Sequence, residues 1–430
     1  MKPIDRRILQ LAIPSIISNI TAPLLGMVDL AIVGHLGDVA LIGAIAVGSM
    51  IFNVMYWLLG FLRMGTCGMT SQALGKRDFQ EVMTLWLSSM AVGMGLGCLL
   101  ILLQWPISQL SFIAIHPSDN IWQFVETYFK ICIWGAPAML GLYGLTGWYI
   151  GMQNTRVPML VSIVQNVVNI VASLILALGL DMKLEGVALG TVIAQWTGFL
   201  LSLLIWFRYY GKLKGYMTGV HLTGNFFTVN RDLFLRTVFL VSVNLFFVSA
   251  GARSGDVVLS ANTLLMTLYT LFSYIMDGFA FAGEALGGKS YGRQDRAEFN
   301  EVCRRLALWG GGMVVLFTLL YIAGGHLLLS LLTSDAAVLA VTDSYMGWAL
   351  LIPVAGVGAF ILDGIFVGLT ATRGMIVSSF LSTMLFLVVY FAGMNVWSNH
   401  ALWLAFILYL LNRGVVQFIW LKKINRVIWK

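Results

Sequence analysis

Long apolar stretches separated by short polar breaks run along the chain from Ile8 to Trp420. A bilayer core requires about 20 apolar residues for each helical crossing. A transmembrane barrel would instead show segments of about ten residues that alternate in polarity, whereas residues 193–207 are apolar on every face. The pattern therefore predicts an all-α integral membrane protein with twelve transmembrane helices, at residues 8–36, 41–74, 82–105, 120–152, 157–180, 185–209, 231–254, 257–289, 297–332, 340–370, 374–397 and 400–421.

The composition excludes an ordinary soluble domain. Hydrophobic residues make up 59% of the 430 positions and charged residues only 10%, whereas soluble domains have about 25% charged residues. No spacing among the four cysteines or five histidines indicates a disulfide framework or a metal site. We therefore expect neither a metal nor any other cofactor.

The positions of the basic residues predict the orientation in the membrane. Lys and Arg gather in alternate connections, among them those at Arg77, Arg236 and Arg293, whereas the opposite connections contain only Lys183 and Arg253. Because Lys and Arg are enriched in cytoplasmic loops, both termini are predicted to lie in the cytoplasm and the protein in the inner (plasma) membrane. The net charge of +7 then reflects topology and contact with membrane lipids, and we expect no nucleic-acid partner.

Two parts of the sequence repeat at a fixed displacement. Residues 75–78 (GKRD) correspond to 292–295 (GRQD), and 151–156 (GMQNTR) correspond to 368–373 (GLTATR), both 217 positions later. Six helices in each half give parallel repeats, so the prediction is two six-helix bundles related by a pseudo-two-fold axis along the membrane normal. The predicted parts are an N-lobe at 1–209, a cytoplasmic linker at 210–230 and a C-lobe at 231–430. Duplication without relative motion of the halves is the alternative.

Ionisable side chains inside a membrane are rare, so each one is a candidate functional residue. Asp29 lies late in the first predicted helix, six residues after Pro23, which is expected to bend that helix. A carboxylate buried in apolar surroundings takes up a proton more readily than one in water, unless a cation keeps it ionised. Asp29 is therefore a candidate coupling site; the alternative is a hydrogen-bonded structural acid near the outer interface.

Uncharged polar residues mark the fifth and sixth predicted helices. Asn166, Asn169 and Ser173 are spaced by three and four residues and share one helical face, and Thr191 and Gln195 are one turn apart. Together with Asp29 they are candidates for a polar pocket in the N-lobe. The alternative is that these side chains only join neighbouring helices by hydrogen bonds.

The second half contains a different polar set, Asp277 and Glu284 on one face of the eighth helix and Asp363 in the tenth. Arg63, in the second helix, is a candidate partner for one of these acids, which would make part of the set a structural ion pair. The sequence leaves both interpretations open.

Several motifs resemble those of one transporter family. They are GMVDLAIVGHLG at 26–37, GFLRMGT at 60–66, DGFAFAGEA at 277–285 and LDGIF at 362–366. In this order and spacing they resemble the DinF-like branch of the multidrug and toxic compound extrusion (MATE) family, over essentially the whole chain. The resemblance implies two six-helix lobes around a cleft and a monomer that exports cationic or amphipathic drugs in exchange for protons or sodium ions.

The resemblance also implies roles for single residues. Asp29 matches the family's first-helix aspartate, which is proposed to bind the coupling ion, and Asn169 and Thr191 match polar members of that site. Relatives carry a second acid one turn after the asparagine, where this chain has Ser173. One carboxylate fewer favours protons over sodium as the coupling ion.

The sequence thus predicts a proton-coupled (alternatively sodium-coupled) multidrug antiporter and not an enzyme, because no catalytic constellation or ATP-binding loop is present. The alternative function is a flippase of lipid-linked or other amphipathic metabolites. Such a flippase needs a more cationic cavity, and Lys130, Arg63 and Arg413 are the only strong candidates for basic residues in mid-membrane.

Overall fold

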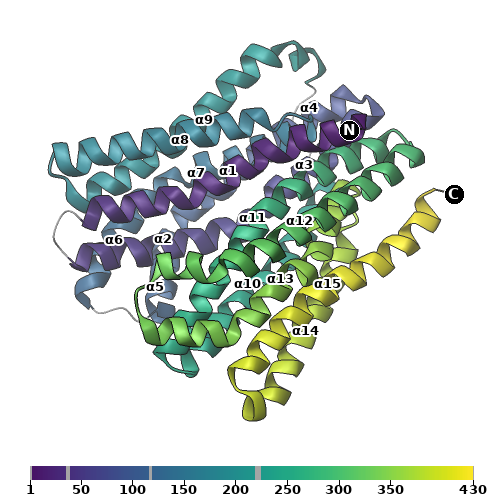
Figure 1. The fold of residues 1–430 in the computed structure, drawn as a ribbon. Coiled ribbons are helices and arrows are strands. Elements are labelled where there is room, and N and C mark those ends of the chain that lie inside the picture. Colours follow the sequence, from purple (N-terminus) through teal and green to yellow (C-terminus); the bar gives the residue numbers. More distant parts are fainter. Residues whose placement is uncertain (1, 35–38, 116–118, 218–223, 430) are drawn as a thin grey trace. The chain divides into compact units, whose positions relative to one another are not determined.

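The computed structural model describes residues 2–34, 39–115, 119–217 and 224–429. Every regular element in these ranges is a helix, as Figure 1 shows. Eleven of the helical segments are long and apolar enough to cross a membrane. The segment missing from these eleven is the first predicted crossing, in α1 (Pro3–Gly34), where several side chains lie outside the described part of the structure. The predicted all-α membrane architecture is confirmed for the described ranges.

Helices of the first half follow the predicted crossings, with three differences. Crossing 41–74 consists of two helices that meet at Gly60, and crossing 120–152 is divided by a short 3-10 turn before Pro137, which has no amide hydrogen to donate. A further helix, Gln104–Ile115, follows the third crossing. After α1 the helices are α2 (Val39–Leu59), α3 (Phe61–Lys76), α4 (Phe79–Leu102), α5 (Gln104–Ile115), α6 (Asp119–Cys132), α7 (Ala136–Gly151), α8 (Arg156–Leu174) and α9 (Lys183–Tyr209).

Six long helices form the second half, one for each predicted crossing. The segment predicted as a linker includes a 3-10 turn at Gly211–Tyr216, and α10 begins at Gly224, before the predicted start at 231. The residues between 224 and the predicted start are also helical, and Phe226 and Val229 among them are buried. The helices are α10 (Gly224–Arg253), α11 (Asp256–Gly292), α12 (Arg296–Leu332), α13 (Ala336–Gly368), α14 (Thr372–Trp397) and α15 (Asn399–Ile428).

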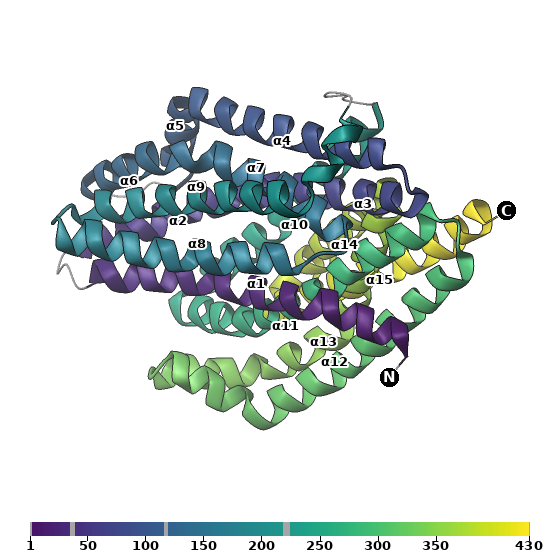
Figure 2. The same cartoon turned by 90° about the horizontal axis from the view of Figure 1, so that it is seen from above.

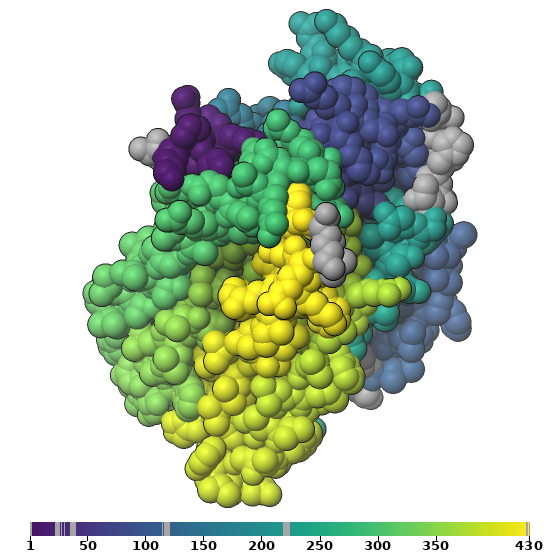
Figure 3. Space-filling model, turned by 90° about the vertical axis from the view of Figure 1, so that its right-hand side faces the viewer, coloured from purple at the N-terminus to yellow at the C-terminus, as the bar shows by residue number. Residues whose placement is uncertain are grey.

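The chain forms two compact units, an N-terminal unit of residues 17–227 and a C-terminal unit of residues 1–16 and 228–430. Ion pairs explain why the first turns of α1 belong to the C-terminal unit. Arg7 Nη1 lies 2.6 Å from Glu298 Oε1 of α12, and Arg305 Nη1 lies 3.5 Å from Asp5 Oδ2. Figure 3 shows these first residues, in purple, against the green surface of α12.

The backbone repeats at the displacement found in the sequence. Three pairs of non-glycine residues 217 positions apart have positive φ angles: Arg77 and Gln294 (60° and 57°), Gln153 and Thr370 (65° and 51°), and Asp181 and Ser398 (53° and 48°). Such angles are uncommon outside glycine, so the agreement is strong evidence that both units have the same local design. The symmetry axis between the units stays a prediction.

Equivalent glycines bring the same helices into contact in each unit. A Cβ atom on Gly147 of α7 would lie 2.2 Å from the Arg63 carbonyl oxygen of α3, and one on Gly364 of α13 would lie 2.3 Å from the Ala280 carbonyl oxygen of α11. The two pairs are again 217 positions apart. Small residues allow membrane helices to approach closely, so these glycines set the spacing of the core helices.

Gly364→Val is therefore expected to lower stability by about 3 kcal/mol, because α13 must move away from α11. Thermal unfolding of the detergent-purified protein measures the effect. The matched control is Gly311→Val in α12, at an exposed position where a new Cβ would contact nothing. Equal melting temperatures for both variants would contradict this account of the helix spacing.

Candidate functional site

Asp29 is a buried acid on the part of α1 that belongs to the N-terminal unit. Its side chain is only 6% exposed, and no hydrogen-bond partner for its Oδ1 atom lies among the described residues. Tyr128 and Cys132 of α6 are within electrostatic reach of the carboxyl group. Several uncharged and basic side chains of the described residues also have a buried polar atom without a partner, but Asp29 is the one carboxyl group among them. A buried acid in this state is a candidate functional group.

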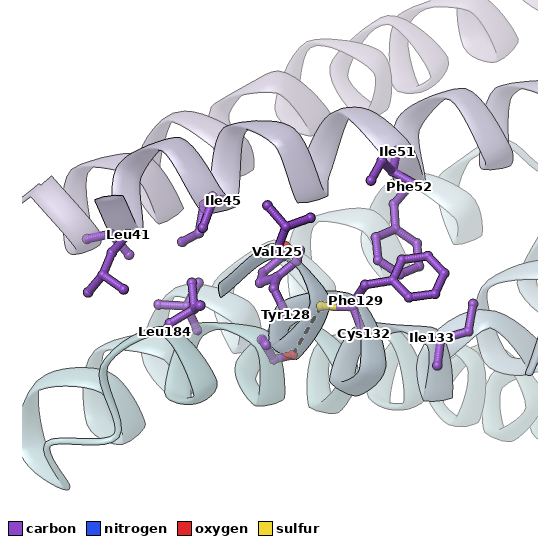
Figure 4. Packing of buried hydrophobic residues seen from close by; sticks show 14 of the residues in the cluster. Leu41, Ile45, Ile51, Phe52, Val125, Tyr128, Phe129, Cys132, Ile133 and Leu184 are labelled. Carbon is purple, nitrogen blue, oxygen red and sulfur yellow. Dashed lines mark hydrogen bonds between the residues drawn. The ribbon is translucent and has the colours of Figure 1, made fainter. Parts of the chain in front are cut away.

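The α6 neighbours of Asp29 are held in an apolar cluster. Figure 4 shows the Phe129 ring against the Phe52 ring of α2, with Tyr128 and Cys132 on the same stretch of α6. The Cys132 thiol donates a hydrogen bond to the Ala188 carbonyl of α9, with an Sγ to O distance of 3.7 Å. These contacts fix the α6 wall next to Asp29 and connect it to α9.

The predicted polar residues of α8 and α9 do meet. Asn169 Nδ2 donates to Thr191 Oγ1 at 3.1 Å, and Ser173 Oγ donates to Asn169 Oδ1 at 3.5 Å. Gly190 makes this contact close, because a Cβ there would lie 2.4 Å from Ser173 Oγ. Asn169 and Ser173 are fully buried, so the three side chains largely satisfy one another.

Electrostatic and hydrogen-bond links place Asp29 and these residues in one region of the N-terminal unit. Asp29 is within electrostatic reach of Cys132, Cys132 donates to the Ala188 carbonyl, and Thr191 lies one helical turn beyond Ala188 on α9. On the other side Asn166 of α8 donates to the Thr21 carbonyl of α1 at 3.0 Å. Figure 2 shows α1, α8 and α9 side by side. Asn166 thus joins α8 to α1 by a hydrogen bond, and Asn169 and Thr191 join α8 to α9 in the same way.

Gln195 faces a different neighbour. Its Oε1 atom occupies the space beside Gly135, where a Cβ would lie 1.6 Å away, and its side chain is next to the Tyr56 hydroxyl of α2. Within the described residues this buried Oε1 atom has no hydrogen-bond partner. The predicted set therefore divides into the Asn169, Ser173 and Thr191 triad and a separate Gln195 position.

Pro23 lies within the helical backbone of α1, and its side chain lies outside the described residues. The predicted bend of this helix therefore stays a prediction.

Asp363 is the centre of a buried ionic cluster in the C-terminal unit. Its carboxylate forms ion pairs with Arg236 of α10 and with Arg413 of α15, the latter at 2.5 Å. Gln417 Nε2 donates to its other oxygen at 2.5 Å. We call these four residues the Asp363 cluster. Asp363 is thus an ion-pair acid, as one interpretation of the sequence held, but its partners are Arg236 and Arg413.

The other two predicted acids of this unit lie along α11. Glu284 is almost completely buried, where α11 and α13 touch at Gly368. Asp277 is half-buried and within electrostatic reach of Tyr269 and Tyr274. In the described ranges, no group of three or more His, Cys, Asp or Glu side chains is placed to hold a metal ion.

The MatE family model matches the chain twice, over residues 14–175 and 233–392. The chain belongs to the MatE family. The double match agrees with the repeat, since each half of this MatE protein carries one copy of the family's helical pattern. Solved proteins that share this fold are named as MATE transporters.

Individual relatives support the assignment. DNA damage-inducible protein F of Escherichia coli is 36% identical over 421 residues, which cover 96% of this chain and 90% of that protein. The multidrug export protein MepA of Staphylococcus saprophyticus is 22% identical over 76% of this chain and 73% of its own. The crystal structure of the Vibrio cholerae MATE transporter VcmN in the bent form has a TM-score of 0.90 at 16% identity and covers 99% of this chain and 98% of its own. The resemblance inferred from the motifs is confirmed.

Sequence reasoning missed two members of the Asp363 cluster. Arg236 was counted with the cytoplasmic cations, yet its side chain is only 8% exposed, and Gln417 was not considered. Their positions offered a signal: Arg236 is well inside α10, and Gln417 is one turn after Arg413 on α15. Lys130, one of the three suggested mid-membrane cations, is instead largely exposed and pairs with Glu126.

Proposed function

We propose that this MatE protein is a secondary active transporter that exports cationic or amphipathic organic compounds in exchange for protons. Asp29 is the coupling acid of this proposal. The observation that carries it is the burial of the Asp29 carboxyl group with an oxygen that has no hydrogen-bond partner among the described residues. Such a group changes its protonation state readily when the access of water or the occupant of the site changes.

The neighbouring polar residues favour protons over sodium ions. Asn169, Ser173 and Thr191 bond to one another, and the Thr191 hydroxyl donates to the Val187 carbonyl. Asp29 is then the acid of the proposed site. A bare cation needs several oxygen ligands at once, whereas a proton needs a single basic atom. MepA, a relative that is named as a multidrug export protein, supports the class of substrate.

The proposed cycle uses one carboxyl group twice. Protonation of Asp29 from outside neutralises it and weakens its attraction for a cationic substrate, which leaves outward. A substrate cation that enters from the cytoplasm favours the ionised carboxylate, and the proton is released inward. If one proton exchanges for one monovalent cation, no net charge crosses, so a difference of one pH unit supports a substrate gradient of roughly tenfold.

The proposal also places both termini in the cytoplasm and takes the monomer as the unit of function.

Transport by the purified protein tests the proposal. Proteoliposomes loaded with rhodamine 123, a lipophilic cation, receive a pH difference or a sodium difference at zero membrane potential. We expect movement of the dye with the pH difference alone. Movement driven only by sodium would contradict proton coupling, and no movement under either gradient would contradict drug antiport and favour the flippase alternative.

A further inference from the structure

The Asp363 cluster contains more positive than negative charge. Two guanidinium groups contact one carboxylate, so the cluster as defined has a net charge of +1. Both arginine side chains are less than a tenth exposed, and Arg413 Nε has no hydrogen-bond partner among the described residues. A surplus charge is costly in an apolar interior, because little solvent is present to stabilise it.

The repeat shows that the fold does not require these charges. At the displacement of 217 residues, Asp363, Arg413 and Gln417 correspond to Thr146, Trp196 and Leu200 of the N-terminal unit. The equivalent helices of the N-terminal unit thus pack without any of these three polar groups. A packing requirement shared by both units therefore does not explain the cluster, so we look for a role specific to the C-terminal unit.

Aromatic rings adjoin the cluster. The Arg413 guanidinium carbon lies 5.5 Å from the centre of the Tyr409 ring, and Tyr269 is within electrostatic reach of Arg413. The half-buried Tyr269 lies beside Phe406, with ring centres 5.2 Å apart. Such rings suit the flat apolar body of an amphipathic molecule, whereas a guanidinium fork suits the two oxygens of an acidic group.

We propose that the Asp363 cluster binds the acidic group of amphipathic substrates that carry a carboxylate or sulfonate. Asp363 is a positioning residue that holds one nitrogen of each guanidinium, and Arg413 offers its remaining donors to the substrate acid. Asp277 is also within electrostatic reach of Tyr269. The inference rests on the proposed transport function and widens its substrate class from cations to zwitterions and acids.

Two dyes that differ in one group test this inference. Rhodamine 110 has a free carboxylic acid, and rhodamine 123 is its methyl ester, so only the first presents a carboxylate. Transport of both is measured in phosphatidylcholine vesicles, which lack anionic headgroups, for the wild type and for Arg413→Gln. This substitution makes the cluster neutral and leaves Asp363 paired with Arg236. We expect the KM for rhodamine 110 to rise about tenfold and that for rhodamine 123 to change less than twofold.

Controls separate the possible failures. Arg413→Lys keeps the charge without the fork and is expected to give an intermediate KM for rhodamine 110. Melting temperatures show whether each variant is folded, and unchanged rhodamine 123 transport shows that the variant still completes the transport cycle. Equal changes for both dyes, or none for rhodamine 110, would overturn the inference while the proposed function stands. Failure of the wild type to move rhodamine 123 would instead overturn the proposed function.

Discussion

Asp29→Asn is expected to abolish proton-driven efflux of rhodamine 123, with the gradient-driven rate at least about a hundredfold below that of the wild type. The amide has the shape of the carboxyl group but cannot take up a proton in this cycle. The substitution removes no hydrogen bond from Oδ1, since that atom has no partner among the described residues. We therefore expect a folded protein that has lost coupling. The measurement is the initial efflux rate from proteoliposomes over a range of pH differences.

Asp181→Asn is the matched control for this prediction. Asp181 lies in the same unit, is exposed, and has a φ of 53°, which asparagine adopts as easily as aspartate. It is expected to transport at the wild-type rate with the same dependence on pH. Full proton-driven efflux by Asp29→Asn would exclude Asp29 as the coupling acid, and an equal loss in the control would show that the assay reports general damage.

Asp363→Ala is expected to have the largest effect on stability, a loss of about 3 to 5 kcal/mol. It removes the carboxylate that Arg236 and Arg413 both contact and the acceptor for Gln417. Uncompensated guanidinium groups in an apolar interior account for most of the cost. Thermal unfolding in detergent and the yield of monodisperse protein measure it, and at the upper end of this range we expect very little folded material.

Removal of both arginine charges together with the Asp363 carboxylate is expected to restore stability. In the triple variant Asp363→Leu, Arg236→Met and Arg413→Met, apolar side chains replace the buried ions, and such replacements are often neutral or stabilising. Asp343→Asn, which affects an exposed pair with His326, should change stability by less than about 0.5 kcal/mol. A stable Asp363→Ala protein, or a triple variant no better than the single one, would contradict the ionic origin of the effect.

The sequence predicted the features that depend on burial in the bilayer and on the local pattern of residues. The bilayer requires long apolar helices, so the crossings were evident from their length, although the backbone break at Gly60 and the extra helix at Gln104–Ile115 were not. The repeat at 217 positions survives in the backbone as paired positive φ angles such as those of Arg77 and Gln294. Asp29 stood out because charges inside a membrane are rare.

Contacts between distant helices could not be predicted in the same way. Asn169 and Thr191 were suggested as partners by their polarity and do meet, but Gln195, one turn further along α9, faces Gly135 and Tyr56 instead. The burial of Arg236 depends on the position of Asp363, which is 127 residues later in the chain. Helix packing decides such pairs, and one sequence without related sequences contains little information about it.

Proton movement coupled to substrate movement tests the central claim most directly. Proteoliposomes that contain a trapped pH indicator and start without a pH difference receive a rhodamine 123 gradient at zero membrane potential. The proposal predicts that wild-type protein moves protons opposite to the dye, in proportion to it, and that Asp29→Asn moves none. Dye movement without any proton movement in the wild type, or equal proton movement in the variant, would contradict it.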